Sequence, residues 1–166
     1  MNSNLIKELR DKTGAGIMAC KSALESSNGD IEKAMSILQE QGIALARKKS
    51  GRSAKEGIIS SYIHSNSKIG VLLEINCETD FVAKTEDFKD LAHQITMQIA
   101  AMDPIYLDAE SEFNNKDIEP TSENSLLQQT FIKDSEKTIK SLIEETSGKL
   151  GENIQIKRFQ RFAISD

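Results

Sequence analysis

The spacing of hydrophobic residues changes near residue 55, and this change limits the folds open to the chain. Upstream, apolar residues recur every three or four positions, which is the period of amphipathic helices. Downstream, they alternate with other residues in two stretches, 58–64 and 69–77, which is the pattern of half-buried strands. At 166 residues the chain is long enough for one domain and a small second one. We therefore expect an α+β protein with an all-helical domain at 1–50 and an α+β core at 56–166.

The first 50 residues contain three helix patterns separated by glycine-containing turns at 13–16 and 26–29. Asp30 follows the second turn and is suited to cap the third helix, and Gly42 is expected to end or interrupt that helix. Each pattern has one apolar face, which predicts a compact three-helix bundle. The apolar faces comprise Leu5, Ile6 and Leu9, then Ile17, Cys20, Ala23 and Leu24, then Ile31, Ala34, Ile37 and Leu38.

Charge is distributed unevenly along the chain, although 21 basic and 26 acidic residues give a net charge of only −5. Residues 1–55 hold ten basic and six acidic side chains. The last five basic ones are Arg47, Lys48, Lys49, Arg52 and Lys55. No aromatic residue that could stack on bases lies among them, so a solvated basic linker at 51–55 is favoured over direct nucleic-acid binding. The same stretch is also suited to contact an acidic protein.

The core pattern continues with a helix, an acidic segment, a second helix and a last strand. The first of these helices begins near Thr85, and the second is expected to have Ser135 as its cap and Gly151 at its end. Residues 103–124 hold seven acidic side chains, one lysine and both prolines, which predicts an acidic, mobile loop. Phe159 falls out of the alternation of the last strand, which predicts a bulge or a bend before Phe162. We expect a three-stranded antiparallel sheet packed with helices, whose open edges favour self-association.

The stretch 77–82, Cys-Glu-Thr-Asp-Phe-Val, is the one most indicative of function. It lies between the second strand and the next helix, where the chain turns and where Asp80 needs a partner if it is buried. In one interpretation Phe81 projects from this loop and inserts into a pocket of another protein. In the other, Phe81 and Val82 cover the end of the sheet and Asp80 caps the helix. The residue pattern alone favours the second interpretation but leaves both open.

Other functional classes find little support in the residues. A thiol enzyme would pair Cys77 with His64 or His93, but Cys77 lies on the apolar face of its strand, which indicates a buried structural thiol. Two cysteines without metal-ligand spacing predict reduced thiols, no metal site and no cofactor. The turn at 13–16 lacks the lysine of a phosphate-binding loop. No apolar run approaches ~20 residues and no signal-peptide pattern is present, so we expect neither membrane insertion nor export. A helical adaptor for ubiquitin-like or acidic partners is a second hypothesis.

Several stretches of the sequence occur together, and in the same order, in one known protein family. They are Leu9-Arg10 with Thr-Gly-Ala-Gly-Ile-Met at 13–18, Asn-Gly-Asp at 28–30, Ile-Asn-Cys-Glu-Thr-Asp-Phe-Val-Ala at 75–83, and Gly-Glu-Asn-Ile at 151–154 with Arg158-Phe159. Through them the chain resembles elongation factor Ts along nearly its whole length. The resemblance implies a ubiquitin-associated-type fold for the bundle and a guanine-nucleotide exchange factor, not an enzyme with chemistry of its own.

The resemblance also implies the partner, which is the GTPase elongation factor Tu in its GDP-bound form. The bundle is then expected to contact the nucleotide-binding domain of the GTPase, while Asp80 and Phe81 disturb its Mg²⁺ and phosphate site and promote GDP release. The residues implied to bind the partner are Arg10, Ile17, Met18, Thr79, Asp80, Phe81 and Val82. We expect this activity to support translation elongation in a bacterial cytoplasm, or in a plastid stroma if the chain is plastid-encoded.

The chain departs from the family at some positions. Ile17 and Ala19 replace a methionine and an aspartate that many members have, which alters the docking face of the second helix. Met18 lies on the mainly polar side of that helix, although its burial against the first helix stays open. The single core unit resembles half of the core of longer members, so we expect a homodimer. Gln160 replaces a cysteine of some short members, so this dimer needs no disulfide. The acidic segment 103–124 replaces a helical segment of other short members.

Overall fold

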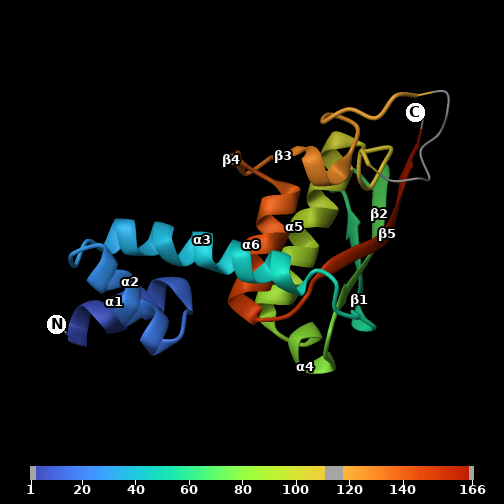
Figure 1. Ribbon diagram of the computed structural model, residues 1–166. Coiled ribbons are helices and arrows are strands. Elements are labelled where there is room, and N and C mark those ends of the chain that lie inside the picture. Colours follow the sequence, from blue (N-terminus) through green and yellow to red (C-terminus); the bar gives the residue numbers. More distant parts are fainter. Residues whose placement is uncertain (1–2, 111–117, 165–166) are drawn as a thin grey trace.

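The structure is a computed structural model that describes residues 3–110 and 118–164 of the chain. Three helices form an N-terminal bundle, and a three-stranded sheet covered by two long helices forms the core (Figure 1). The elements are α1 (Ser3–Thr13), α2 (Ile17–Ser26), α3 (Ile31–Lys49), β1 (Glu56–Ile63), β2 (Ile69–Cys77), α4 (Asp80–Ala83), α5 (Glu86–Met102), the 3-10 helix η1 (Leu126–Gln128), β3 (Thr130–Phe131), β4 (Asp134–Thr138), α6 (Ile139–Leu150) and β5 (Gln155–Ala163). This arrangement confirms the predicted α+β class. No helix within the described residues combines the length and apolarity needed to cross a membrane.

The bundle forms because each helix contributes one apolar face to a small core of its own. Its buried side chains are Leu9, Cys20, Ala23, Leu24 and Ala34. Gly14 has a φ of +68° in the first turn, where a residue with a side chain would be strained. Asp30 caps α3 as predicted, since its carboxylate accepts a hydrogen bond of 3.0 Å from the amide of Lys33. The sequence pattern places Ile17 in this core, but its side chain is exposed because it begins α2, one turn before the buried face starts.

Helix α3 continues to Lys49, so the expectation that Gly42 ends or interrupts it is wrong. Gly42 lies where α3 crosses α6, and a Cβ atom on Gly148 of α6 would lie 2.5 Å from the Gly42 carbonyl oxygen. The absence of side chains therefore allows close helix packing and does not terminate the helix. The last turn of α3 contains basic residues 47–49, which are favourable at the negative end of the helix dipole. Figure 1 shows α3 extending from the bundle to the core.

Polar contacts along α3 and after it join the bundle to the core. The guanidinium of Arg47 donates to the carboxylate of Glu144 in α6 at 3.2 Å. Lys49 donates through Nζ to a carbonyl oxygen that follows α6, at 2.5 Å. Arg52 forms an ion pair of 3.7 Å with Glu78, at the end of β2. Three residues of the basic run thus contact the core, while the side chains of Arg52 and Lys55 in the linker stay exposed.

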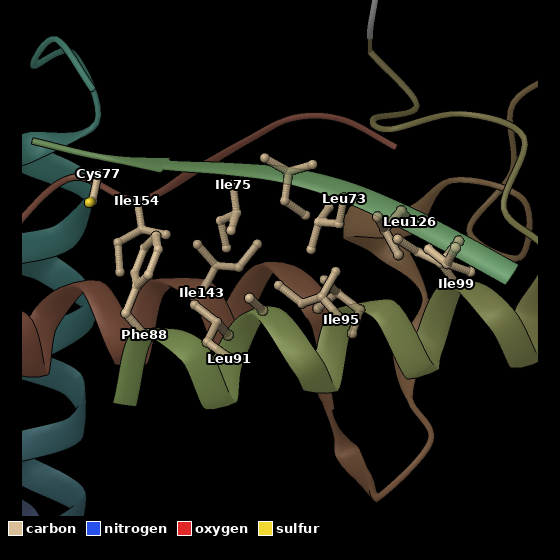
Figure 2. Packing of buried hydrophobic residues seen from close by; sticks show 14 of the residues in the cluster. Leu73, Ile75, Cys77, Phe88, Leu91, Ile95, Ile99, Leu126, Ile143 and Ile154 are labelled. Atoms are coloured by element: carbon tan, nitrogen blue, oxygen red, sulfur yellow. The ribbon is translucent and has the colours of Figure 1, made fainter. Parts of the chain in front are cut away.

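The core sheet has the antiparallel strand order β1-β2-β5. Its inner face packs against α5 and α6, and Figure 2 shows Leu73 and Ile75 of β2 among side chains of both helices. The register pairs Ile75 with Ile156 but Glu74 with Arg158, so β5 contains one extra residue between these pairs. This confirms the bulge that the parity of the last strand predicts.

Helix α6 begins later than predicted, and its cap is Thr138 instead of Ser135. Ser135 lies in β4, which pairs with β3 in a hairpin that the sequence pattern does not predict. The strand β4, Asp-Ser-Glu-Lys-Thr, contains no apolar residue, so hydrophobic alternation is absent there. Thr138 and Ser141 form a capping box, in which each side chain accepts a hydrogen bond from the other residue's amide. The predicted end at Gly151 is confirmed, with a left-handed φ of +76°.

The acidic segment 103–124 lies on the core between α5 and η1. Its middle residues, 111–117, on which part of the predicted mobile loop falls, lie outside the described residues. Tyr106 is buried and forms a bridge with Ser125, and its hydroxyl donates to the carbonyl oxygen of Ile118 at 2.6 Å. The two described ends of the segment are therefore fixed to the core.

Candidate partner-binding site

The chain makes a short turn between β2 and α5, and we call residues 79–82 the tip. Thr79 caps the single helical turn α4, since its Oγ1 accepts a hydrogen bond of 3.4 Å from the amide of Val82. Successive residues of a helix point about 100° apart, so Phe81 and Val82 project in different directions. Val82 is the one that packs on the core, and Phe81 is 79% exposed.

This geometry distinguishes between the two interpretations of residues 77–82, in which Phe81 either projects towards a partner or covers the end of the sheet. Val82 covers the end of the sheet, but Phe81 does not. Nor is Asp80 a helix cap, because Thr79 caps α4 and Thr85 caps α5, which begins near Thr85 as predicted. A large exposed ring beside a buried anchor is the arrangement expected of a residue that inserts into a partner.

Asp80 lies beside Phe81 and is exposed to solvent. Its Oδ2 accepts a hydrogen bond of 2.6 Å from Nζ of Lys84, one turn later. This hydrogen bond lowers the pKa of Asp80 and raises the pKa of Lys84, so both groups are charged at neutral pH. Because the pair is exposed, it contributes little to folding stability. The Asp80–Lys84 pair instead places charged groups directly next to the apolar ring of Phe81.

A carboxylate from a distant segment holds the base of the tip. The side chain of Glu152 accepts hydrogen bonds from the amides of Glu78 and Thr79, both at 3.0 Å, and from the Thr79 hydroxyl at 2.6 Å. Sequence patterns do not point to Glu152 as a functional residue, because no periodicity links it to a residue 73 positions earlier. The motif at 151–154, which contributes to the family resemblance, is the sequence signal that marks this segment.

The other expected site residues, Arg10, Ile17 and Met18, are all exposed on the bundle. Met18, whose burial the sequence leaves open, is 74% exposed. Exposed apolar side chains such as Ile17 and Met18 are typical of protein-binding surfaces. Figure 1 shows α1 and α2 well separated from α4, so the seven expected residues form two groups and not one continuous site.

Cys77 lacks the features of a catalytic thiol. Its side chain is fully buried, and burial, together with the negative charge of Glu152, raises the pKa of Cys77 to about 11. His64 forms a hydrogen bond of 3.1 Å with Tyr62, and the ring of His93 also packs near Tyr62, at 6.0 Å between centroids. Across residues 3–110 and 118–164, no group of histidine, cysteine, aspartate and glutamate is arranged to hold a metal ion.

Cys77 is expected to resist alkylation in the folded protein. With a pKa of about 11, only about one thiol in a thousand is ionised at pH 8, and burial blocks access to that fraction. We expect iodoacetamide at pH 8 to leave Cys77 unmodified under native conditions, as measured by mass spectrometry of the peptides. The same reaction in guanidinium chloride, where Cys77 is accessible, serves as the control. Rapid alkylation of native Cys77 would contradict the prediction.

Comparison with known proteins identifies the family. A profile described as "Elongation factor TS" matches residues 4–121. Elongation factor Ts of Thermotoga maritima is 45% identical over an alignment of 193 residues, which covers 100% of this chain and 97% of the relative. The protein of the same name from Caldanaerobacter subterraneus is 47% identical over 191 residues, covering 98% of this chain and 96% of the relative. The chain therefore belongs to the elongation factor Ts family of translation elongation factors.

Proposed function

We propose that this protein is a guanine-nucleotide exchange factor that binds elongation factor Tu·GDP and promotes GDP release during translation elongation. The observation that carries this proposal is the exposed ring of Phe81, held on a capped turn with the charged Asp80 beside it. Membership of the elongation factor Ts family supports the same partner. The protein performs no covalent chemistry and needs no cofactor. It acts in the bacterial cytoplasm, or in a plastid stroma if it is plastid-encoded.

In this function Phe81 acts as a wedge at the Mg²⁺ and phosphate site of the GTPase. Burial of a phenyl side chain is worth ~1.5–3 kcal/mol, and this free energy stabilises a form of the GTPase that holds GDP less tightly. Asp80 competes for hydrogen bonds near the bound anion or repels it. By linkage, the factor and GDP each weaken the binding of the other to the same extent. Exchange therefore requires only that the factor bind more tightly to the form of the GTPase that holds GDP weakly than to the form that holds GDP tightly.

The bundle and the tip contact the GTPase at two places. Ile17 and Met18 supply apolar contact area, and Arg10 supplies a charge. At the tip, Thr79 and Val82 set the backbone that carries the intruding pair. Because α3 is packed closely on α6, the two groups keep a fixed separation. Binding of the bundle then raises the effective concentration of the tip at its own site.

Stopped-flow release of a fluorescent GDP analogue from elongation factor Tu tests this function. We expect the release rate to rise with the concentration of the protein and to reach a plateau, because a ternary complex forms before GDP leaves. A pull-down with the immobilised protein is expected to capture the GTPase and to lose it when excess GDP is added. A release rate that does not change with the concentration of the protein would contradict the proposal.

The outer face of the sheet supports a homodimer. Strand register places five exposed apolar side chains on the side of the sheet opposite α5 and α6: Ile59, Ile63, Leu72, Phe162 and Ile164. They come from all three strands, and four of them, Ile63, Leu72, Phe162 and Ile164, line one shallow pocket, while Ile59 lies beside Glu74. Contiguous apolar surfaces of this kind mark protein interfaces. We infer that two chains associate through this face, which brings two core units into one particle.

Phe162→Asp is expected to convert the dimer into a monomer. Phe162 is 64% exposed in the single chain, so the change costs little in folding, but in the dimer it would bury a carboxylate among apolar groups. Size-exclusion chromatography with light scattering at micromolar concentration measures the mass of each form. Ile132→Asp, at an exposed apolar residue between β3 and β4, is the control and should stay dimeric. A wild-type protein with the mass of one chain would contradict the prediction.

A further inference from the structure

The loop that follows α6, residues 151–153, reaches the base of the tip. It accepts hydrogen bonds from the base of the tip and also donates one to it. Glu152 accepts from the amides of Glu78 and Thr79, and the carboxylate of Glu78 in turn accepts from the amide of Asn153 at 2.7 Å. The Asn153 side-chain amide donates to the carbonyl oxygens of Ser50 at 3.1 Å and Arg52 at 2.6 Å. One short loop therefore contacts the tip and the segment that leads out of α3.

The position of Glu152 is itself fixed by the end of α6. Gly151 adopts the left-handed conformation that ends the helix, so the chain turns there towards β2. The hydroxyl of Ser147, one turn earlier in α6, donates to the backbone carbonyl oxygen of Glu152. The neighbouring residue Asn153 is buried. The carboxylate thus projects from a rigid support, which is what a residue that orients another group needs.

The three bonds to Glu152 decide where α4 begins. They fix both the amide and the hydroxyl of Thr79, and the same hydroxyl oxygen accepts the capping bond from Val82. Phe81 is mostly exposed, so packing holds its ring only weakly. The direction of the ring therefore depends on the cap at Thr79 and on burial of Val82. Loss of the carboxylate would leave two amides and a hydroxyl without these partners and would free the start of α4.

We propose that Glu152 is a positioning residue for Phe81: its carboxylate fixes the start of α4 so that the ring points at the partner. This inference rests on the proposed exchange function. Glu152 is half-buried at the base of the tip and is not one of the residues expected to bind the GTPase. It acts on the rate of GDP release only by positioning α4, and mainly through the ring of Phe81. Two consequences follow, one in the exchange reaction and one in the free protein.

In the exchange reaction, Glu152→Ala is expected to lower the maximal rate of stimulated GDP release about tenfold and to change the half-saturating concentration less than about threefold. In a Phe81→Ala background the same change is expected to cost less than about twofold, because no ring is left to orient. Glu152→Gln keeps an accepting oxygen and a polar partner for Thr79, and should restore most of the rate. Glu145→Ala, at a half-buried carboxylate of α6 that bonds Gln39 and Lys137, is the matched control and should leave the rate unchanged. Equal losses in both backgrounds, or a wild-type rate for Glu152→Ala, would overturn the proposal.

In the free protein, hydrogen exchange measures the same effect without the partner. The amides of Glu78 and Thr79 are expected to exchange at least about tenfold faster in Glu152→Ala than in the wild type, while amides in α5 keep their rates. Unchanged exchange at both amides would overturn the proposal. If the wild-type protein does not stimulate GDP release, the proposed function fails, and the exchange rates still decide whether Glu152 holds the tip. Should Glu152→Ala not fold, the same exchange measurement on Glu152→Gln decides it, with a smaller acceleration expected.

Discussion

Replacement of Phe81 by alanine is expected to lower the maximal rate of stimulated GDP release about 10- to 100-fold. The variant loses the ~1.5–3 kcal/mol that burial of the ring supplies in the complex. Each 1.36 kcal/mol corresponds to about a factor of ten in rate. Because Phe81 is 79% exposed in the free protein, the lost free energy belongs to the complex and not to the fold.

Two further variants make this result specific. Phe81→Leu keeps part of the apolar volume and is expected to have an intermediate rate. Ile105→Ala removes an exposed apolar side chain beyond the opposite end of α5, and its rate should equal that of the wild type. All three variants should unfold at nearly the wild-type temperature, since substitutions at exposed sites usually change stability by less than about 0.5 kcal/mol. Wild-type release by a folded Phe81→Ala protein would remove Phe81 from the mechanism.

The parts of the fold that depend on neighbours in sequence were predictable. Asp30 precedes an amphipathic pattern and caps α3, and α5 begins near Thr85 as predicted, because a side-chain oxygen at such a position satisfies amides within one turn. The parity change at Phe159 indicates the bulge in β5, because side chains of a strand alternate with a period of two. Gly151 ends α6 because a left-handed residue is needed there.

Features that depend on pairs of residues far apart in the chain were not predictable. Gly42 resembles a helix terminator, and only its position against Gly148 in another helix shows that it serves packing. The support of the tip by Glu152 depends on a contact of the same kind. At the candidate site, residue types and the family resemblance point to Phe81 and Met18. Their exposure depends on which side chains pack around them, so it required the fold.

Replacement of Gly148 by alanine is expected to lower the free energy of unfolding by about 2–3 kcal/mol. The new Cβ atom would lie 2.5 Å from the carbonyl oxygen, 2.6 Å from the carbonyl carbon and 2.7 Å from the Cα atom of Gly42. All three are backbone atoms, so no change of rotamer relieves the overlap. Helices α3 and α6 must move apart, which also weakens contacts such as the one between Arg47 and Glu144.

Gly42→Ala is the matched control, because the crossing of the two helices is not symmetric. A Cβ atom on Gly42 would meet only the Cα atom of Gly148, at 3.8 Å, which is ordinary van der Waals contact. Alanine is also favoured over glycine inside a helix by ~1 kcal/mol, so this variant should be as stable as the wild type or slightly more stable. Urea unfolding followed by circular dichroism measures both changes. Since the crossing sets the position of the bundle on the core, Gly148→Ala alone should also raise the half-saturating concentration for GDP release. Equal destabilisation by the two variants would contradict this geometry, as would a Gly148→Ala protein of wild-type stability.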